Sequence, residues 1–575
     1  MAAAVLVLGL SVSLPAGEAA RREIDRTLAE VLGRPEFQSS TFGVSFARVK
    51  TGEVIFEHGS RRLLAPASNT KIVSTAGALA ALGKDYQFDT RIVAGGAVKD
   101  GVLLGDLVLV AVGDFNLSQR IGPGGRLLFK DKDHSYAGFY EAGVVPGDPL
   151  AVIKDLAEQV HRAGVRQVRG DIVVDDGFFE ETEDEFVGVF SAVCVNDNLL
   201  DVTVEPGQRE GAPARYSYEP RGSIVRVESS ATTVAEGRPA EVWIESLDET
   251  ASFRLGGSIP LGSKPILRTA SFRRPALAAA SFLADELRRL GVGIEGKERQ
   301  ATQGPTAYET RPVLALHRSP PLSEAIRVIL KVSHNLHATM LPVLLGALKG
   351  GRADRRSGYK VIHDLFQSQG IDMGAIVLQS GSGGGRADSI SAGWMTDFLV
   401  HLARREDFPV FLDALPIGGH DGTLESAFKD PVFEKRVRAK TGTLVYRGSL
   451  NDRWVYLSKS LSGYIDLDRP DDRLAFSIII ANTICEGRKK GADDLFRAQE
   501  DIVRAAMEAV RAESAPADTE GEERSRRRIT TETRKHRGEK KGEERKGGGG
   551  GTGGGAGEGA GKSQPPTDTD RTPTR

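Results

Sequence analysis

Three short motifs in this chain carry residue types that can perform acyl transfer. Ser68-Asn69-Thr70-Lys71 comes first and places a hydroxyl nucleophile three residues before a lysine that can act as its base. Ser333-His334-Asn335 adds a second hydroxyl, which can pass a proton to a leaving amine. Lys440-Thr441-Gly442 adds a cation and a hydroxyl that suit a carboxylate. The set predicts a site in which a serine attacks an amide carbonyl.

The surrounding sequence distinguishes these copies from others of the same pattern. Ser68 is followed by an alanine-rich apolar run to Leu82, closed by Gly83, which predicts a buried helix with Lys71 one turn after the serine. Lys440 lies in the strand-like run 437–444. The other copies lack such surroundings, and the one that begins at Lys50 has the position of a hairpin turn. These copies are Lys50–Gly52, Ser357–Lys360, Ser426–Lys429 and Ser449–Asn451.

Strands and helices are expected near both ends of the chain. Two strand-like runs precede Ser68, and three more contain or follow Lys440. Helical periodicity is present at 21–32 and again at 493–513. The chain is therefore predicted to be α+β, with one antiparallel five-stranded sheet flanked by helices. The expected strands are 42–49, 54–58, 437–444, a run around 461–464, and 474–481.

The segment between Lys71 and Ser333 is far too long for a simple connection. Its strand-like runs, such as 105–110 and 170–175, and two helix-like runs predict a large inserted, mostly β, accessory region of two subdomains. The glycine-rich and charged end of the chain cannot bury a core, so we expect a disordered tail. The expected division is 1–20 as a signal peptide, 21–88 plus 312–511 as a catalytic domain, 89–311 as the accessory region, and 512–575 as the tail.

The composition is that of a globular protein. The 575 residues are 40% hydrophobic and 27% charged, and the formal net charge of −2 gives no electrostatic reason to expect nucleic acid as a partner. Basic patches in the tail could contact anionic polymers, although a solvated tail without function is the favoured interpretation.

The beginning of the chain resembles a secretory signal peptide. The apolar run Ala2 to Leu14 is followed by the small-residue stretch Pro15 to Ala20. A positively charged region before the run is missing, so a start codon farther upstream and a buried N-terminal helix stay open as alternatives. The run is too short to span a bilayer. We expect export to the periplasm or another extracytoplasmic location, without stable membrane insertion after signal removal.

No pattern requires a cofactor or a metal ion. Cys194 and Cys485 lack metal-ligand spacing and are expected to be buried small residues, although a disulfide between them stays open. Gly381–Gly385 lacks the Lys-Ser/Thr of a phosphate-binding loop and is interpreted as a loop that lines the site. His334 could titrate near the site, but a packed or exposed spectator is the favoured interpretation.

Further segments follow the three motifs in one order along the chain. With them, the chain resembles the D-alanyl-D-alanine carboxypeptidase/endopeptidase family, the low-molecular-mass class C penicillin-binding proteins, over about Ile24 to Asn482. The resemblance implies the penicillin-binding/β-lactamase-like transpeptidase fold, and the large insertion is typical of this family. The segments are Gly105–Val110 with Gly113-Asp114, Asn196–Asn198 with Pro206-Gly207, Ser319–Ser323, Gly381–Gly383 with Arg386, Asp421–Leu424 and Leu461–Tyr464.

The resemblance also implies a reaction and roles for individual residues. The expected activity is that of a serine D,D-peptidase, a carboxypeptidase and/or endopeptidase that acts on peptidoglycan stem peptides through an acyl-enzyme and is inhibited by β-lactam antibiotics. Ser68 would be the nucleophile, Lys71 its base and Ser333 the proton relay. Backbone N–H groups of Ser68 and Thr443 would form the oxyanion hole. The substrate-binding residues would be Asn335, Lys440, Thr441, Gly442 and Thr443.

Three features depart from the family pattern. The loop that is usually rich in Trp is acidic here, Phe178–Glu185, and Ser380 replaces an acidic residue in the glycine-serine loop. A long polar insert, with Arg447 and Trp454, follows Thr443. We interpret the acidic loop as part of the cleft, where it would favour substrates with a free ammonium group.

Two other functions are compatible with parts of this pattern. A serine β-lactamase shares the three motifs, but the insertion is unnecessary for a small antibiotic and no E-x-x-L-N motif is evident between the first two motifs. A catalytically silent wall-binding protein would share the fold, but the complete motifs argue against it. Labelling with a fluorescent penicillin separates the three.

Overall fold

The computed structural model describes residues 16–514, except 119, 139–140, 249 and 470–471. The chain divides into two units, Met1–Ser514 and Ala515–Arg575, and the description below concerns the first. The expected signal peptide core and the tail beyond Ser514 lie outside the described residues. Within the described part, no helix has the length and apolar character needed to cross a membrane. Cys194 and Cys485 are both free and buried.

The central sheet contains the five strands expected from the sequence and one more. Its order is β2-β1-β24-β23-β22, and each neighbouring pair is antiparallel. A sixth, short strand, β25, pairs with the first part of β23. The polar insert after Thr443 is the far end of the long β22–β23 hairpin. The strands are β1 (Thr41–Arg48), β2 (Val54–His58), β22 (Val437–Arg447), β23 (Trp454–Asp466), β24 (Arg473–Ala481) and β25 (Thr483–Cys485).

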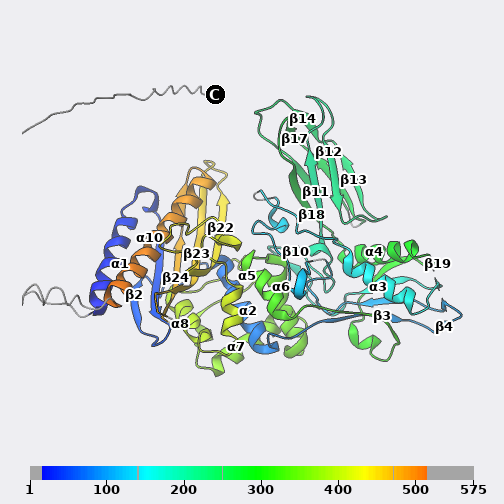
Figure 1. Cartoon of the computed structure of the whole chain (residues 1–575), viewed down its shortest axis with the longest axis horizontal. Helices are drawn as coiled ribbons and strands as arrows, with labels where there is room; N and C mark the ends of the chain where they lie inside the picture. Colours follow the sequence, from blue (N-terminus) through cyan, green and yellow to red (C-terminus); the bar gives the residue numbers. More distant parts are fainter. Residues whose placement is uncertain (1–15, 119, 139–140, 249, 470–471, 515–575) are drawn as a thin grey trace, which may run out of the picture. The chain divides into compact units, whose positions relative to one another are not determined.

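Alternating side chains in β1 and β24 give the sheet two apolar faces. Phe42, Val44 and Phe46 pack in one cluster with apolar residues of α1 (Ala16–Leu32) and α10 (Arg488–Ser514). These two helices come from opposite ends of the chain and lie against each other (Figure 1). The other face is covered by α8 (Ala392–Leu402). The sheet is therefore buried on both sides, which explains its continuous apolar strands.

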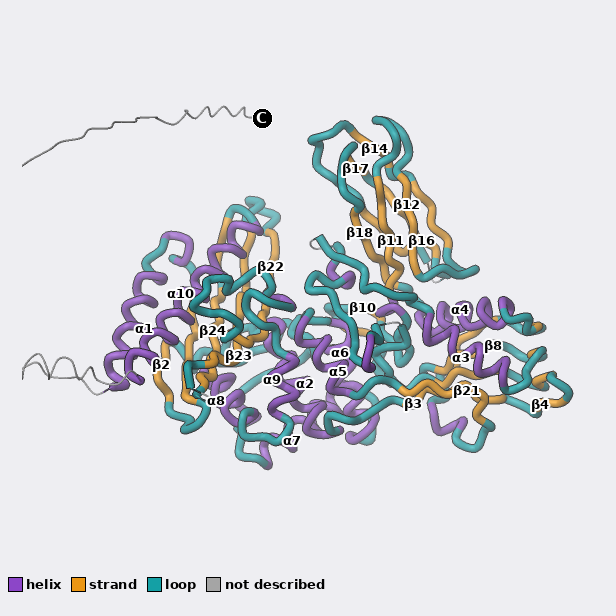
Figure 2. The backbone as a smooth tube through the Cα atoms, viewed as in Figure 1, coloured by secondary structure: helices purple, strands orange, loops and turns teal. Residues whose placement is uncertain are grey.

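The helices beyond α8 form the layer that holds the first two motifs. α2 packs against α5, α6 and α7, and α5 packs against α9. These helices are drawn as one purple group beside the orange strands β22 to β24 (Figure 2). They are α2 (Thr70–Leu82), α5 (Leu322–Lys331), α6 (Asn335–Leu345), α7 (Arg355–Ser368) and α9 (Phe408–Ala414).

The segment between α2 and α5 forms several smaller sheets and two helices. A five-stranded sheet, β20-β8-β6-β3-β21, and a four-stranded sheet, β19-β7-β5-β4, are accompanied by α3 (Ala151–Arg162) and α4 (Pro275–Arg289). Their strands are β3 (Asp89–Ala94), β4 (Val98–Lys99), β5 (Val102–Leu103), β6 (Leu107–Val110), β7 (Gln167–Val168), β8 (Ile172–Asp175), β19 (Gly293–Ile294), β20 (Glu298–Ala301) and β21 (Val313–Arg318).

The remaining strands of this segment form four small sheets. Three of them, β12-β11-β18, β13-β16-β15 and β14-β17, lie in the upper part of Figure 1, and β10-β9 is a separate hairpin. Their strands are β9 (Glu183–Asp184), β10 (Gly188–Val189), β11 (Leu199–Glu205), β12 (Arg215–Glu219), β13 (Arg226–Ser229), β14 (Thr232–Val234), β15 (Trp243–Ser246), β16 (Ser252–Gly256), β17 (Ser258–Pro260) and β18 (Ile266–Ser271).

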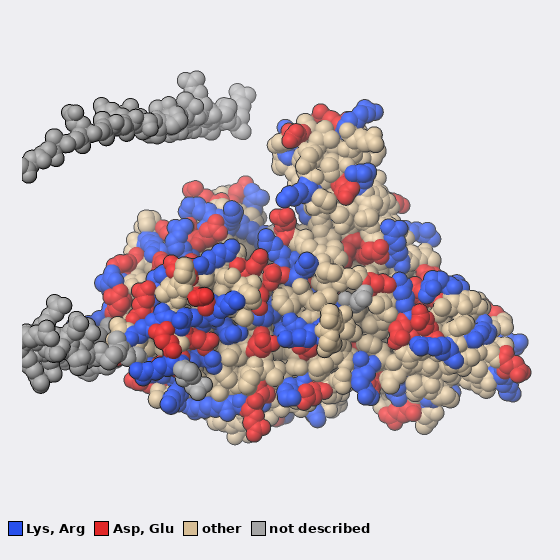
Figure 3. All heavy atoms as spheres, in the orientation of Figure 1, with Lys and Arg blue, Asp and Glu red and all other residues tan. Residues whose placement is uncertain are grey.

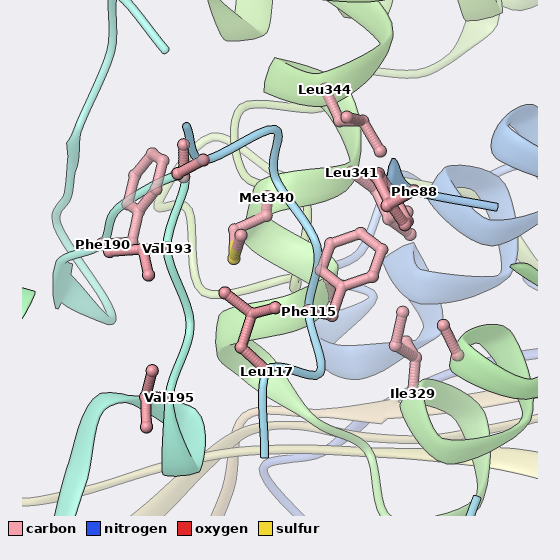
Figure 4. Close-up of a cluster of buried hydrophobic side chains, with 14 of the residues drawn as sticks. Phe88, Phe115, Leu117, Phe190, Val193, Val195, Ile329, Met340, Leu341 and Leu344 are labelled. Atoms are coloured by element: carbon pink, nitrogen blue, oxygen red, sulfur yellow. The ribbon is translucent and has the colours of Figure 1, made fainter. Parts of the chain in front are cut away.

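A shared hydrophobic core joins this accessory segment to α6. Phe115, Phe190 and Val193 of the accessory segment are buried in the same cluster as Met340 and Leu344 of α6. Figure 4 shows these side chains converging between the accessory loops and the helix. Since Ser333-His334-Asn335 lies directly before and at the start of α6, the packing of the accessory segment helps to fix the position of the second motif.

Candidate active site

Ser68 lies in a tight turn immediately before a buried helix. It is part of the 3-10 turn Ala67–Asn69, which leads directly into α2. Ala67 has a φ of 47°, which lies in the left-handed region and is strained for alanine. A Cβ on Gly442 would come within 3.0 Å of the Ser68 amide nitrogen, so β22 approaches the serine backbone as closely as glycine permits. The first and third motifs therefore meet at this turn.

Lys71 is fully buried and points at the Ser68 hydroxyl. Its Nζ lies 2.8 Å from Ser68 Oγ, 2.7 Å from Asn335 Oδ1 and 2.8 Å from the backbone oxygen of Ser382. All three contacts are neutral oxygens, and no described carboxylate forms an ion pair with this amine. The geometry brings the first two motifs together, as the sequence predicts, and adds the Gly381–Gly385 loop as a third wall.

The surroundings of Lys71 favour its neutral form. Burial lowers the pKa of Lys71 well below its usual value, and the charge of Lys440 lowers it further. The Asp388 carboxylate raises the pKa of Lys71, but it lies behind the Gly381–Gly385 loop. There it accepts a hydrogen bond from the Ser380 hydroxyl at 2.8 Å. An uncharged lysine amine in contact with a serine hydroxyl can remove the proton of that hydroxyl.

The second motif forms a strained turn between α5 and α6. Ser333 has a φ of 63°, and its side chain is nearly buried at the edge of the cleft. The hydroxyl of Tyr136, an accessory-segment residue, donates to the backbone oxygen of Ser333 at 2.5 Å. His334 caps α6 by accepting from the His337 amide. The turn is thus held from outside by Tyr136 and from within by the cap.

A buried cluster of charged residues lies behind this turn. Asp197 accepts from Arg120, from His134 Nε2 and from His337 Nε2, the last two at 2.7 Å. His134 also contacts Asp201 Oδ1 at 2.7 Å. His334 Nε2 lies 3.2 Å from Asp197 Oδ2, so the expectation of a packed spectator agrees with its burial but misses its partner.

Opposite charges in this cluster keep each other ionised. Although burial alone would raise it, the Arg120 guanidinium holds the pKa of Asp197 well below its usual range. Burial alone would lower the pKa of His134, yet the carboxylates of Asp201 and Asp133 raise it well above the ordinary value. Burial and the neighbouring His334 lower the pKa of His337 to about 4. Since the carboxylates already have cationic partners, we interpret this cluster as a structural support for the start of α6.

Two triads within and beside the cluster have the residue types and proximity of metal ligands: Cys194, Asp197 and His337, and Asp133, Asp197 and His334. Both depend on Asp197, whose carboxylate oxygens already contact Arg120 and two histidines. A cation would have to compete with the Arg120 guanidinium for the same oxygens. The residues fit a salt-bridged network better than a metal centre.

The third motif contributes hydroxyls to the cleft while its lysine stays behind them. Lys440 is fully buried, and its Nζ donates to the backbone oxygen of Thr441 at 2.7 Å. Burial and the nearby charge of Lys459 lower the pKa of Lys440 to about 7. Thr441 and Thr443 line the cleft, and the Thr441 hydroxyl contacts that of Thr423 at 2.7 Å. Lys440 is not among the residues that line the cleft, so its role in binding a substrate carboxylate stays a prediction, and its positive charge lies directly behind the two threonines.

A single cleft of about 790 Å³ connects these residues. Its wall includes Ser68, Ser333 and Asn335, together with the hydroxyls of the third motif. The copies at Lys50–Gly52 and Ser449–Asn451 lie in hairpin turns away from it, and Lys360 is exposed and paired with Asp364. Other lining residues are Asp131, Lys132, Tyr136, Glu141, Phe186, Ser382, Gly383, Gly384, Thr423, Glu425, Ser426, Tyr446, Tyr456, Lys459, Arg488, Lys489 and Phe496.

The acidic loop does not contribute its carboxylates to the cleft. Glu180 pairs with Arg352, Glu181 with Arg355 and Glu185 with Arg386, at 2.9, 2.5 and 2.7 Å. Phe186, the residue directly after this loop, lines the cleft instead. The interpretation that these glutamates attract a substrate ammonium group is therefore wrong for the paired residues. Sequence reasoning missed their arginine partners because these lie far away along the chain.

Several residues of the site escaped sequence reasoning. Tyr136 and Lys459 carry no motif, and only their folded positions bring them to the cleft. Asp197 lies in the Asn196–Asn198 segment, where three successive residues have φ values of 51°, 54° and 57°. Asparagine tolerates this left-handed conformation better than most residues, so the pattern indicated a special turn but not what it supports.

The fold and the site together define a penicillin-interacting serine enzyme. The sequence matches the D-Ala-D-Ala carboxypeptidase 3 (S13) family over residues 24–501. It is 27% identical to a D-alanyl-D-alanine carboxypeptidase of Actinomadura sp., over 82% of this chain and 84% of that protein. It is 23% identical to the D-alanyl-D-alanine carboxypeptidase DacB of Haemophilus influenzae, over 71% of this chain and 81% of that protein.

Solved structures agree in fold. The crystal structure of penicillin binding protein 4 (dacB) from Haemophilus influenzae superposes with a TM-score of 0.65 at 20% identity, covering 83% of this chain and 99% of that one. The chain belongs to the D-Ala-D-Ala carboxypeptidase 3 (S13) family. It is accordingly a serine D,D-peptidase, and the predicted transpeptidase-like fold with an accessory β region is confirmed.

Proposed function

We propose that this enzyme hydrolyses D-alanyl bonds in peptidoglycan stem peptides or their cross-links, with Ser68 as the nucleophile. The observation that carries the proposal is the contact of the buried, uncompensated Lys71 amine with the Ser68 hydroxyl. Lys71 takes the Ser68 proton as Oγ forms an ester with the carbonyl carbon. The amide C–N bond breaks, and Ser333 relays a proton to the leaving amine. Water then hydrolyses the ester.

The remaining residues hold the substrate. The N–H groups of Ser68 and Thr443 stabilise the oxyanion, and Asn335 orients the peptide carbonyl. The hydroxyls of Thr441 and Thr443 bind the terminal carboxylate, and Lys440 stabilises its charge from behind. Gly442 allows β22 to approach the Ser68 backbone. A β-lactam ring amide presents the same reacting group, and a relative from Haemophilus influenzae has been solved with a β-lactam.

We propose the domain division that the sequence indicates, with its boundaries moved to the ends of the folded elements. The catalytic domain comprises 21–88 and the part of 312–511 that follows β21, because β21 pairs with β3 of the accessory sheet. Export is proposed because peptidoglycan lies outside the cytoplasm. The cleavage site of the signal peptide is placed before Ala20, because Ala20 is buried in α1 and its N–H donates to Glu513. A solvated tail after Ser514, where α10 ends, no nucleic acid partner and no stable membrane insertion complete the proposal.

Penicillin labelling followed by mass spectrometry tests the assignment. A stable adduct on the peptide that contains Ser68 is expected. Lys71→Ala should slow acylation by about 10²- to 10⁴-fold, the usual contribution of a general base, while Lys360→Ala, in the exposed copy of the motif, should not. Rapid turnover of the adduct would indicate a β-lactamase. No adduct in the folded protein would indicate a silent binding protein, and an adduct on Ser426 would overturn the choice of nucleophile.

A further inference from the structure

The catalytic cleft continues past the third motif into a part lined by basic residues. Lys459, Arg488 and Lys489 line the same cleft as Ser68, and they come from β23 and the first turn of α10. The acidic residues that line the cleft, Asp131, Glu141 and Glu425, come instead from the accessory segment and from the segment that follows α9. β23 and the first turn of α10 thus contribute basic but no acidic residues to the lining, whereas the accessory segment contributes Lys132 as well as Asp131 and Glu141.

Lys459 is the central residue of this basic part. Only 4% of it is exposed, and its Nζ donates to Thr443 Oγ1 at 3.0 Å. The amine also lies 3.6 Å from the centre of the Phe496 ring. Among the described residues, no carboxylate forms an ion pair with it, although the charge of Asp493 acts on it from a greater distance. A buried lysine with one neutral acceptor lacks partners for its remaining donors.

An anion would supply those partners. Burial lowers the pKa of Lys459 to about 7, and a bound carboxylate would favour the charged amine. The start of α10 adds the positive end of a helix beside Arg488 and Lys489. Thr443 links the two regions, because its hydroxyl belongs to the proposed carboxylate site and also contacts Lys459.

We propose that Lys459, with Arg488 and Lys489, forms a second anion subsite on the leaving-group side of the cleft. It would bind a carboxylate on the side chain of the residue whose amine leaves, in addition to the α-carboxylate at Thr441 and Thr443. The preferred substrate class is then a D-alanyl peptide whose leaving residue carries a second, free carboxylate on its side chain. This inference rests on the proposed function, since the leaving group is defined by attack of Ser68.

The test compares peptides that are identical except for the leaving residue. Diacylated tripeptides that end in D-Ala-D-Glu and D-Ala-D-Gln have the same size and differ in one charge, and D-Ala-D-Ala serves as the reference. The wild type should have a kcat/KM about tenfold or more higher for D-Glu than for D-Gln. In Lys459→Met this ratio should fall towards one, and in Lys489→Gln it should fall by about twofold to threefold. Lys490→Gln, next along α10 but absent from the cleft wall, is the matched control and should keep the wild-type ratio.

The outcomes separate the two proposals. A wild-type ratio near one, with normal hydrolysis of D-Ala-D-Ala, would overturn the subsite and leave the proposed function intact. A ratio that is high but unchanged in both Lys459→Met and Lys489→Gln would also overturn it. Failure of the wild type to hydrolyse any peptide or to form a penicillin adduct would overturn both. Because the wild-type comparison needs no variant, the result stands even where Lys459→Met does not fold.

Discussion

At the scale of single residues, the site is a row of lysines with few carboxylates. Lys71, Lys440 and Lys459 are all buried. The charge of Lys440 lowers the pKa of Lys71, and the charge of Lys459 lowers the pKa of Lys440. No salt bridge is formed by any of the three within the described part of the chain. The arrangement keeps a base neutral near Ser68 while it offers positive potential to an anionic substrate.

This arrangement predicts a specific pH dependence. Lys440 and Lys459 have pKa values of about 7, so their positive charge is present below that pH and lost above it. For a peptide that ends in a free D-alanine carboxylate, kcat/KM should therefore decline as pH rises above about 7, because this parameter reports the free enzyme. On the acidic side it should decline as Lys71 gains a proton.

The matched control is the same peptide with a C-terminal amide. Because it carries no C-terminal carboxylate, its kcat/KM should be lower overall and should not decline as pH rises above about 7. The decline at low pH, where Lys71 gains a proton, should remain. Equal alkaline limbs for the acid and the amide, measured in constant ionic strength buffers, would show that the lysine charges do not act through the substrate carboxylate.

At the scale of elements, the second motif depends on a segment that lies far from it in sequence. The turn at Ser333 is strained, and it is held by Tyr136 and by the Asp197 cluster, which caps and supports the start of α6. Buried networks of this kind are expensive to break, because removal of one partner leaves another charge unpaired. The accessory segment therefore works as a positioning element for catalysis as well as a wall of the cleft.

Tyr136→Phe tests this support with little change in packing. Loss of the hydroxyl leaves the Ser333 backbone oxygen without this donor, a change of about 1 kcal/mol, so acylation by penicillin should slow about fivefold to tenfold. The adduct should still form on Ser68, and the KM for a peptide should change less than kcat. Tyr216→Phe, at an exposed tyrosine of β12, is the control. An unchanged acylation rate in Tyr136→Phe would show that the turn is held without this hydrogen bond.

At the scale of the whole molecule, the two ends of the described chain meet. Glu513 of α10 pairs with Arg48 of β1 at 3.0 Å and accepts from the backbone N–H of Ala20 in α1. The Glu513 side chain is mostly buried in this contact. This contact changes the expected boundary of the tail, because a tail that starts at 512 would include a residue of the folded unit.

Two truncations differ by Glu513 and Ser514. Removal of everything after Ser514 should leave Tm and penicillin labelling unchanged, since glycine-rich and mixed-charge sequence cannot bury a core. Removal of everything after Ala512 should lower Tm by about 2 °C, because Arg48 loses the nearest of its three carboxylate partners and keeps only Glu53 and Asp472 at 3.7 and 3.9 Å. Differential scanning calorimetry of the two proteins checks this. Equal Tm values would show that the Arg48–Glu513 pair adds no stability, and a large loss after Ser514 would show that the tail docks.

Surface charge at this scale agrees with the composition. Figure 3 shows Lys and Arg interspersed with Asp and Glu over the face drawn. Charges of both signs are thus mixed over that face, in line with the small formal net charge of the whole sequence, −2. Recognition of charged groups is therefore left to concave sites, where burial strengthens each interaction.

The sequence by itself determined the chemistry and the central architecture. The motifs of Ser68, Ser333 and Lys440, the apolar α2 run and the alternation of the five strands depend on local spacing, which is visible in one dimension. The tertiary structure alone decided which charges meet. It paired the acidic loop with arginines, placed Lys440 behind Thr441, and brought Tyr136, Asp197 and Lys459 to the site. These contacts join residues far apart along the chain, and no local pattern encodes a long-range partner.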